Sequence, residues 1–191
     1  LAAEGFWLPS PGRRSMVSMS LCANIAVLFV LPIPYALTIA ALSVGLSDLL
    51  LHRRGLIRAV FNSAQTTIAL AGAVAVMACL RGSSAPGGSQ VMLLHPLATL
   101  APLVIFPAVN VLIVSGILAI EKGQRFGFAW RENYGFWYHY LSCAMLFFVG
   151  LGLVIAVESI GYICGLVSLL ILVCFRETYR LFTRAHRVQP H

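Results

Sequence analysis

Residues 33–80 read IPYALTIAALSVGLSDLLLHRRGLIRAVFNSAQTTIALAGAVAVMACL, and this stretch decides the fold. Two long apolar runs stand on either side of the short basic sequence His52-Arg53-Arg54-Gly55. A helix needs about 20 apolar residues to cross the hydrocarbon core of a bilayer. We therefore predict a membrane-spanning helix over residues 33–51, a tight basic turn, and a second spanning helix over residues 56–80.

The composition of the whole chain agrees with this prediction. The chain is 60% hydrophobic and 10% charged, with a mean hydropathy of +0.90, whereas a soluble domain has about 25% charged residues. The predicted fold class is all-α, a polytopic integral membrane helix bundle with about six transmembrane helices in a single membrane domain over residues 1–191. The further predicted helices cover residues 16–31, 91–120, 136–157 and 160–176.

The connections between these helices differ in length and composition. The first run is short and ends at Pro32, and prolines inside the run at residues 91–120 predict an interfacial start followed by a kink. Residues 121–135 predict a polar and aromatic loop, and Glu158-Ser159 predicts a minimal turn. Residues 177–191 follow the last run and predict an amphipathic basic tail along the lipid headgroups.

The basic residues group at alternate connections. One side of the predicted membrane carries only Arg81, and the other carries Arg13, Arg14, Arg53, Arg54, Arg58, Lys122, Arg125, Arg131, Arg176, Arg180, Arg184 and Arg187. Basic loops are held in the cytoplasm, so the pattern predicts six spans with both termini inside. The net charge of +7 lies at helix ends, which argues against nucleic-acid binding.

Polar residues inside the predicted spans form a candidate intramembrane seam. Asn62, Gln65 and Thr66 are three and four residues apart and share a helix face. They predict either hydrogen bonds between helices or the floor of a ligand cavity or signalling seam. Asp48 is close to several arginines, which favours an ion pair over a proton or metal role. Asn110 lies beside Pro107 and is predicted to bond the carbonyl that proline frees or to bond Asn24.

Groups that could bind a cofactor are sparse. His52 and His139 are near the predicted cytoplasmic surface, and His95 is near the external one. Two histidines on the same side of the membrane can ligate a haem or chlorin. The five cysteines lie in apolar runs without metal-ligand spacing, so no metal site is predicted. No nucleophile–base set, phosphate loop or carboxylate pair is present in the sequence. The cofactor is unknown, and no catalytic residue and no enzyme activity are predicted.

Candidate contacts with lipid or with other membrane subunits come from the connection at residues 121–135, from the last predicted helix and from the basic tail. The connection at residues 121–135 carries Arg and aromatic side chains, which are usual interface anchors and also usual in an interfacial belt. Gly161 and Gly165 form a GxxxG pattern on the last predicted helix, which permits close helix contact. The predicted contact residues are Arg125, Trp130, Arg131, Gly161, Gly165, Arg176 and Arg180.

Residues 48–65, DLLLHRRGLIRAVFNSAQ, carry a family resemblance. They resemble the membrane domain at the N-terminus of some bacterial HD-GYP phosphodiesterases and GGDEF diguanylate cyclases, which is also seen in stand-alone membrane proteins. An acidic residue closing a helix, a basic turn and a Phe-Asn-x-x-Gln start are the shared features, with Asn110, residues 130–133 and residues 176–179 also fitting. The resemblance covers residues 15–184 and implies a sensor or anchor that crosses a bacterial cytoplasmic (inner) membrane several times. The chain has no HD pair or GGDEF-like motif.

Two functions follow as expectations. The first is a non-enzymatic membrane protein that works through association, as an accessory subunit of a larger membrane complex or as a stand-alone sensor-type module. The alternative is a small-molecule binding or transport module with Asn62, Gln65 and Asn110 lining a polar cavity. A hydrated cavity between the third and fourth helices favours transport, whereas a dry bundle favours the subunit.

Overall fold

The computed structural model describes residues 7–9, 16–18, 20–50, 52–81, 95–135, 137–161, 163 and 167. Within these residues the chain is helical apart from one small antiparallel sheet of two strands, β1 (Trp7–Pro9) and β2 (Met16–Ser18). The six helices of the described residues are α1 (Ser20–Val30), α2 (Ile33–Leu50), α3 (Leu56–Arg81), α5 (Pro96–Glu121), α6 (Phe126–Tyr134) and α7 (Trp137–Ile160). By its contacts the chain divides into two compact units, Leu1–Val154 and Ile155–His191.

Four helices, α2, α3, α5 and α7, are long and apolar enough to cross a membrane. Their lengths run from 18 to 26 residues, which at about 1.5 Å per residue gives at least about 27 Å. Large apolar side chains on them are exposed, among them Ile57, Val104 and Met145. Such exposure is costly in water but favourable against lipid. The prediction of six spans stays a prediction, because most of the sixth predicted helix lies outside the described residues.

The first predicted helix, residues 16–31, was wrong at its start. Met16–Ser18 forms strand β2, in which Val17 pairs with Leu8, and α1 begins only at Ser20. Eleven helical residues extend about 16 Å, about half the hydrocarbon thickness of a bilayer. The helix ends before Pro32, where the chain turns into α2.

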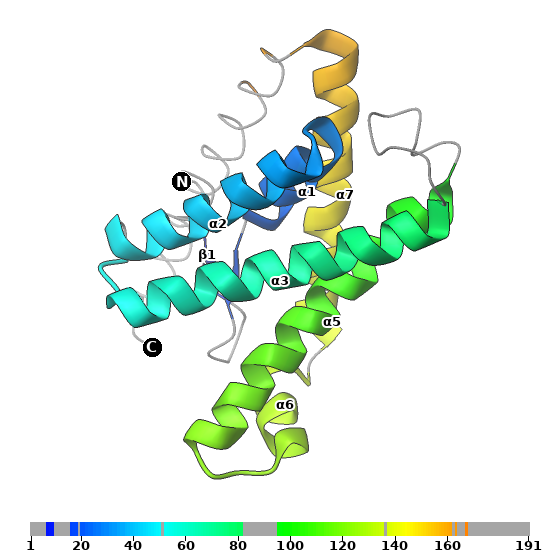
Figure 1. Ribbon diagram of the computed structural model, residues 1–191. Coiled ribbons are helices and arrows are strands. Elements are labelled where there is room, and N and C mark those ends of the chain that lie inside the picture. The colour runs from blue at the N-terminus through cyan, green and yellow to red at the C-terminus, as the bar shows by residue number, and fades with distance from the viewer. Residues whose placement is uncertain are drawn as a thin grey trace, which may run out of the picture. The chain divides into compact units, whose positions relative to one another are not determined.

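Helices α2 and α3 form an antiparallel hairpin, and α3 then packs against α5 (Figure 1). Small residues permit both contacts. The hydroxyl of Ser63 donates to the carbonyl of Ala41 at 2.7 Å, beside Gly45. Gly72 faces Val109 of α5, with 3.7 Å between the position of a Cβ at Gly72 and the nearest methyl carbon. The three helices therefore approach closely, as small residues allow in membrane bundles.

The connection after α5 differs from the predicted loop. Gly123, with φ of +60°, ends α5 at the left-handed position that glycine adopts without strain. The chain then forms a separate nine-residue helix, α6, packed on α5. Residues 121–135 were predicted as a loop because nine residues with Gly127 at the second position give a weak helical pattern. Pro96 begins α5, in agreement with the preference for proline in the first turn.

Helix α7 extends beyond its predicted end. Residues Glu158 and Ser159 continue the helix and do not form the predicted turn. Gly161 follows with φ of +94°, and its N–H donates to the carbonyl of Val157 at 2.9 Å. Near its middle, α7 touches α1, because a Cβ at Gly150 would lie 2.8 Å from the carbonyl oxygen of Cys22.

Candidate functional site

Asp48 is the centre of a polar cluster at the turn between α2 and α3. Its side chain is buried and accepts from Arg54 Nη1 at 3.0 Å and from Asn62 Nδ2 at 2.5 Å. The backbone N–H of Arg54 also donates to the Asp48 carbonyl at 2.8 Å. Arg53, at φ of +49°, reverses the chain and remains exposed. One carboxylate therefore joins the turn to both helices, and its charge is compensated where it is buried.

Gln65 and Asn110 form a second polar contact, between α3 and α5. The Nε2 of Gln65 donates to Oδ1 of Asn110, and Gln65 is only 8% exposed. Gln65 is about 14 Å along α3 from its first residue, and Asn110 is about 16 Å along α5 from its last. The two amides thus lie at similar depth in an antiparallel pair of helices. Buried amides in hydrocarbon require such partners.

The rest of the predicted seam face is occupied by packing. Thr66 lies half-buried beside Gln65. One and two turns further along α3, Ala69 and Ala73 are fully buried, and Gly72 packs on α5. Of the two interpretations of the seam, the contacts between helices are those that the structure displays.

An aromatic cluster joins α6 to the start of α7. Trp130 Nε1 donates to the hydroxyl oxygen of Tyr140 at 3.2 Å. The ring of His139 meets those of Tyr134 and Tyr140 edge-on, at centroid distances of 4.9 and 5.5 Å. Burial raises the pKa of Tyr134 to about 12, with smaller contributions from Cys143 and Tyr140. The phenol of Tyr134 is therefore neutral at physiological pH.

Next to this cluster lies an open-sided cavity of about 600 Å³. Helix α5 supplies its long wall, α6 one end, and α7 two further residues. Its lining residues are Leu103, Val104, Pro107, Ala108, Val111, Leu112, Phe126, Trp130, Tyr140 and Ala144. The sequence did not indicate this cavity, because its walls come from three helices whose arrangement no local pattern specifies.

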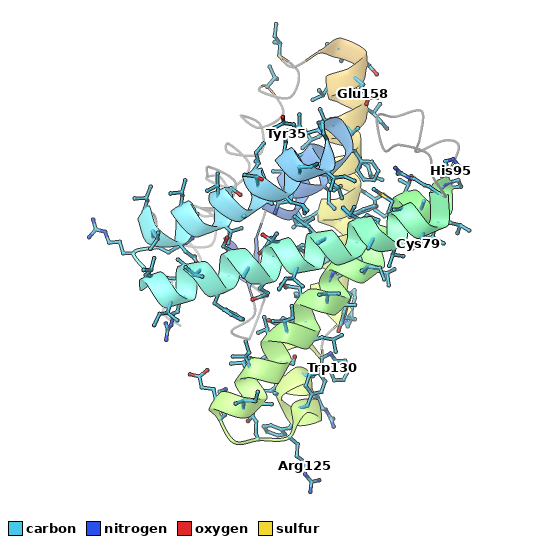
Figure 2. All side chains as sticks on the ribbon, viewed as in Figure 1. Tyr35, Cys79, His95, Arg125, Trp130 and Glu158 are labelled. Carbon is cyan, nitrogen blue, oxygen red and sulfur yellow. The ribbon has the colours of Figure 1, made fainter. Side chains whose placement is uncertain are left out.

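The predicted contact residues fall in different surroundings. Arg125, immediately before α6, extends away from the helices, whereas Trp130 lies beside α5 (Figure 2). Arg131 is exposed. Gly161 is not in a helix, so the prediction of a helical GxxxG pattern was wrong at this position, because the glycine instead terminates α7. Gly165, Arg176 and Arg180 lie outside the described residues, as does the predicted tail.

The candidate haem ligands lie on separate elements. His52 follows α2 in the hairpin turn, His95 precedes α5, and His139 is on α7. His139 is buried, with its Nε2 3.9 Å from Sγ of Cys143. In the part of the chain that the structure describes, no group of three or more His, Cys, Asp or Glu side chains is placed to hold a metal ion.

Comparison with protein-family models, with curated proteins and with solved structures gave no match to this chain. Its function therefore has to follow from its own residues.

Proposed function

We propose that this chain is a non-enzymatic integral membrane protein that works through association, as an accessory subunit of a larger membrane complex. The observation that carries the proposal is that the intramembrane polar side chains bond to one another. Asp48 is compensated by Arg54 and Asn62, and Gln65 by Asn110. These groups join helices to one another. What the helices offer to their surroundings is exposed apolar surface, which suits lipid or other membrane helices.

The proposed orientation places both termini and both basic connections in the cytoplasm of a bacterial inner membrane. Support comes from the antiparallel contact of α3 and α5, in which Gln65 meets Asn110. This contact brings the start of α3 and the end of α5 to the same side. The hairpin turn with Arg53 and the connection with Arg125 then share one face, as the distribution of basic residues requires.

The proposed contact surface is helix α6 with its flanking residues. Phe128 is 61% exposed and Trp130 39%, and Arg125 and Arg131 are exposed beside them. Exposed aromatic and Arg side chains on a short helix at the membrane surface are typical interface anchors. A stand-alone sensor-type module, as the resemblance implies, would present the same surface to a separate output protein.

The test is co-purification in mild detergent. We expect Trp130→Ala with Arg131→Ala to release the chain from its partners while the helical circular dichroism is retained. The matched control is Tyr35→Ala with Arg58→Ala, which also removes one exposed aromatic residue and one exposed arginine. If the α6 variant co-purifies at the wild-type ratio, the proposed surface is wrong.

A small-molecule binding module is the second candidate, and the cavity beside α5 favours it. The cavity is lined by residues other than Asn62, Gln65 and Asn110, whose amides bond protein groups. The cavity therefore supports binding of an apolar molecule rather than passage of a polar one.

A further inference from the structure

The cavity formed by α5, α6 and α7 has the size of a ligand site. Its volume of about 600 Å³ is within the range of about 300–1,000 Å³ that is usual for small-molecule sites. Its α5 wall runs from Leu103 to Leu112, about 14 Å along the helix axis. On its open side Val104 and Leu112 are 63% and 57% exposed. The cavity is therefore an apolar groove that is open on one side.

The chemistry of the lining selects an apolar chain with one hydrogen-bond acceptor. Among the residues that the structure describes, no charged side chain lines the cavity, and the two polar side-chain groups in its lining are the Trp130 indole and the Tyr140 hydroxyl. The indole N–H donates to the Tyr140 oxygen at 3.2 Å. Because an indole N–H is only a donor, the Tyr140 O–H keeps its own hydrogen for a further acceptor. An ester carbonyl is such an acceptor.

Two exposed arginines are next to the lining residues of α6 in the sequence. Arg125 precedes Phe126, and Arg131 follows Trp130, so each lining residue of α6 has an exposed arginine as its chain neighbour. The acidic Glu132 is 4.0 Å from Lys122, and neither of these residues lines the cavity. Guanidinium groups bind phosphate oxygens in a bidentate manner. The groove, the Tyr140 hydroxyl and the neighbouring arginines therefore provide a suitable group for each part of a phospholipid: its acyl chain, its ester carbonyl and its phosphate.

We propose that this groove is a specific site for one anionic phospholipid. One acyl chain lies along α5, its ester carbonyl accepts from Tyr140, and its phosphate is bound by Arg125 and Arg131. The inference rests on the proposed insertion of the chain in a membrane, where a lipid molecule can enter the groove from its open side. It deepens the second candidate function by naming the ligand class.

The test is native mass spectrometry of the purified chain in mild detergent, with phosphatidylglycerol or phosphatidylcholine added. We expect the wild type to retain one phosphatidylglycerol. Ala144→Phe places a ring in the groove and should weaken retention about tenfold, a loss of about 1.4 kcal/mol. Ala64→Phe adds the same ring at an exposed position of α3 and should leave retention unchanged. Ala108→Phe fills the groove from α5 and replaces Ala144→Phe if that variant fails to fold.

The headgroup part of the proposal has its own variant. Arg125→Gln with Arg131→Gln should retain one lipid but lose the preference for phosphatidylglycerol over phosphatidylcholine. Wild-type retention by both groove-filling variants would show only surrounding lipid and overturn the site. Equal retention of both lipids by the wild type, or a molecule other than a phospholipid in its organic extract, would overturn the proposed ligand. Because the isolated chain is measured, none of these results bears on co-purification with partners.

Discussion

Replacing Asn110 by leucine should expose the contribution of the amide contact between α3 and α5. The substitution removes the oxygen that accepts from Gln65 Nε2, and Gln65 is 8% exposed. Its amide would then lie against apolar helix surface without a partner, about 14 Å along α3 from the first residue of the helix. In water-soluble proteins such a loss costs about 1–3 kcal/mol. Hydrogen bonds between membrane helices average about 0.6 kcal/mol with a maximum near 1.7, so we expect about 1 kcal/mol.

A double-mutant cycle measures the contact itself. Asn110→Leu, Gln65→Leu and the double variant would be unfolded reversibly by dodecyl sulfate in mixed micelles, with circular dichroism as the signal. We expect a coupling free energy of about 0.6 kcal/mol or more, the double variant losing less than the sum of the singles. Thr38→Val is the control, because its hydroxyl donates to Pro34 of its own helix at an exposed position. Strict additivity of the two leucine variants would refute the contact.

Three further predictions follow from single positions. Gly150→Leu should cost about 1–3 kcal/mol by forcing α7 away from α1, whereas Gly152→Leu, with nothing within 4 Å of its Cβ position, should cost nothing in the same unfolding assay. With the five native cysteines replaced, new cysteines at Ser84 and Gln124 should react with impermeant reagent from opposite sides of the membrane, and labelling of both from one side would exclude the proposed orientation. The pKa of Tyr134 is raised to about 12, above its unfolded value of about 10, so its contribution to stability should be complete below pH 10 and lost as pH rises to 12. Tyr134→Phe should abolish that part of the alkaline loss.

The hairpin of α2 and α3 was predictable because local chemistry specifies it. Pro32 precedes the observed start of α2 at Ile33, and His52 to Gly55 cannot remain in hydrocarbon without partners. Observed and predicted bounds of α2 and α3 differ by one residue at most, at their C-terminal ends. The prediction that Asp48 forms an ion pair needed only its nearness to arginines. That Asp48 pairs with Arg54 and not with a neighbouring arginine depends on the left-handed backbone at Arg53. The amino-acid composition does not reveal this backbone conformation.

Features that depend on neighbouring helices were not predictable in the same way. Asn110 was expected to bond a proline-freed carbonyl or Asn24, but its oxygen accepts from Gln65, because the register of α3 against α5 is a property of packing. Helix α6 has only nine residues. A helical pattern of apolar residues this short cannot be distinguished from a loop that is rich in aromatic residues. Strand β2 comes directly before α1 and is apolar like it. Composition alone therefore could not show where the strand ends and the helix begins.

The contacts of Asp48 imply an order in which the chain is assembled during synthesis. Helix α3 carries Arg58, Asn62 and Gln65 near its start, and each opposes release of that helix alone from the translocon into lipid. The partners of Asp48 lie just across a short turn, so they are available as soon as α2 and α3 have both been made. We expect the two helices to leave the translocon together as one hairpin in which the charge of Asp48 is already paired with Arg54. Gln65 has its partner, Asn110, only after α5 has been made. Docking of α5 is therefore a separate, later step of the two-stage pathway of membrane protein folding.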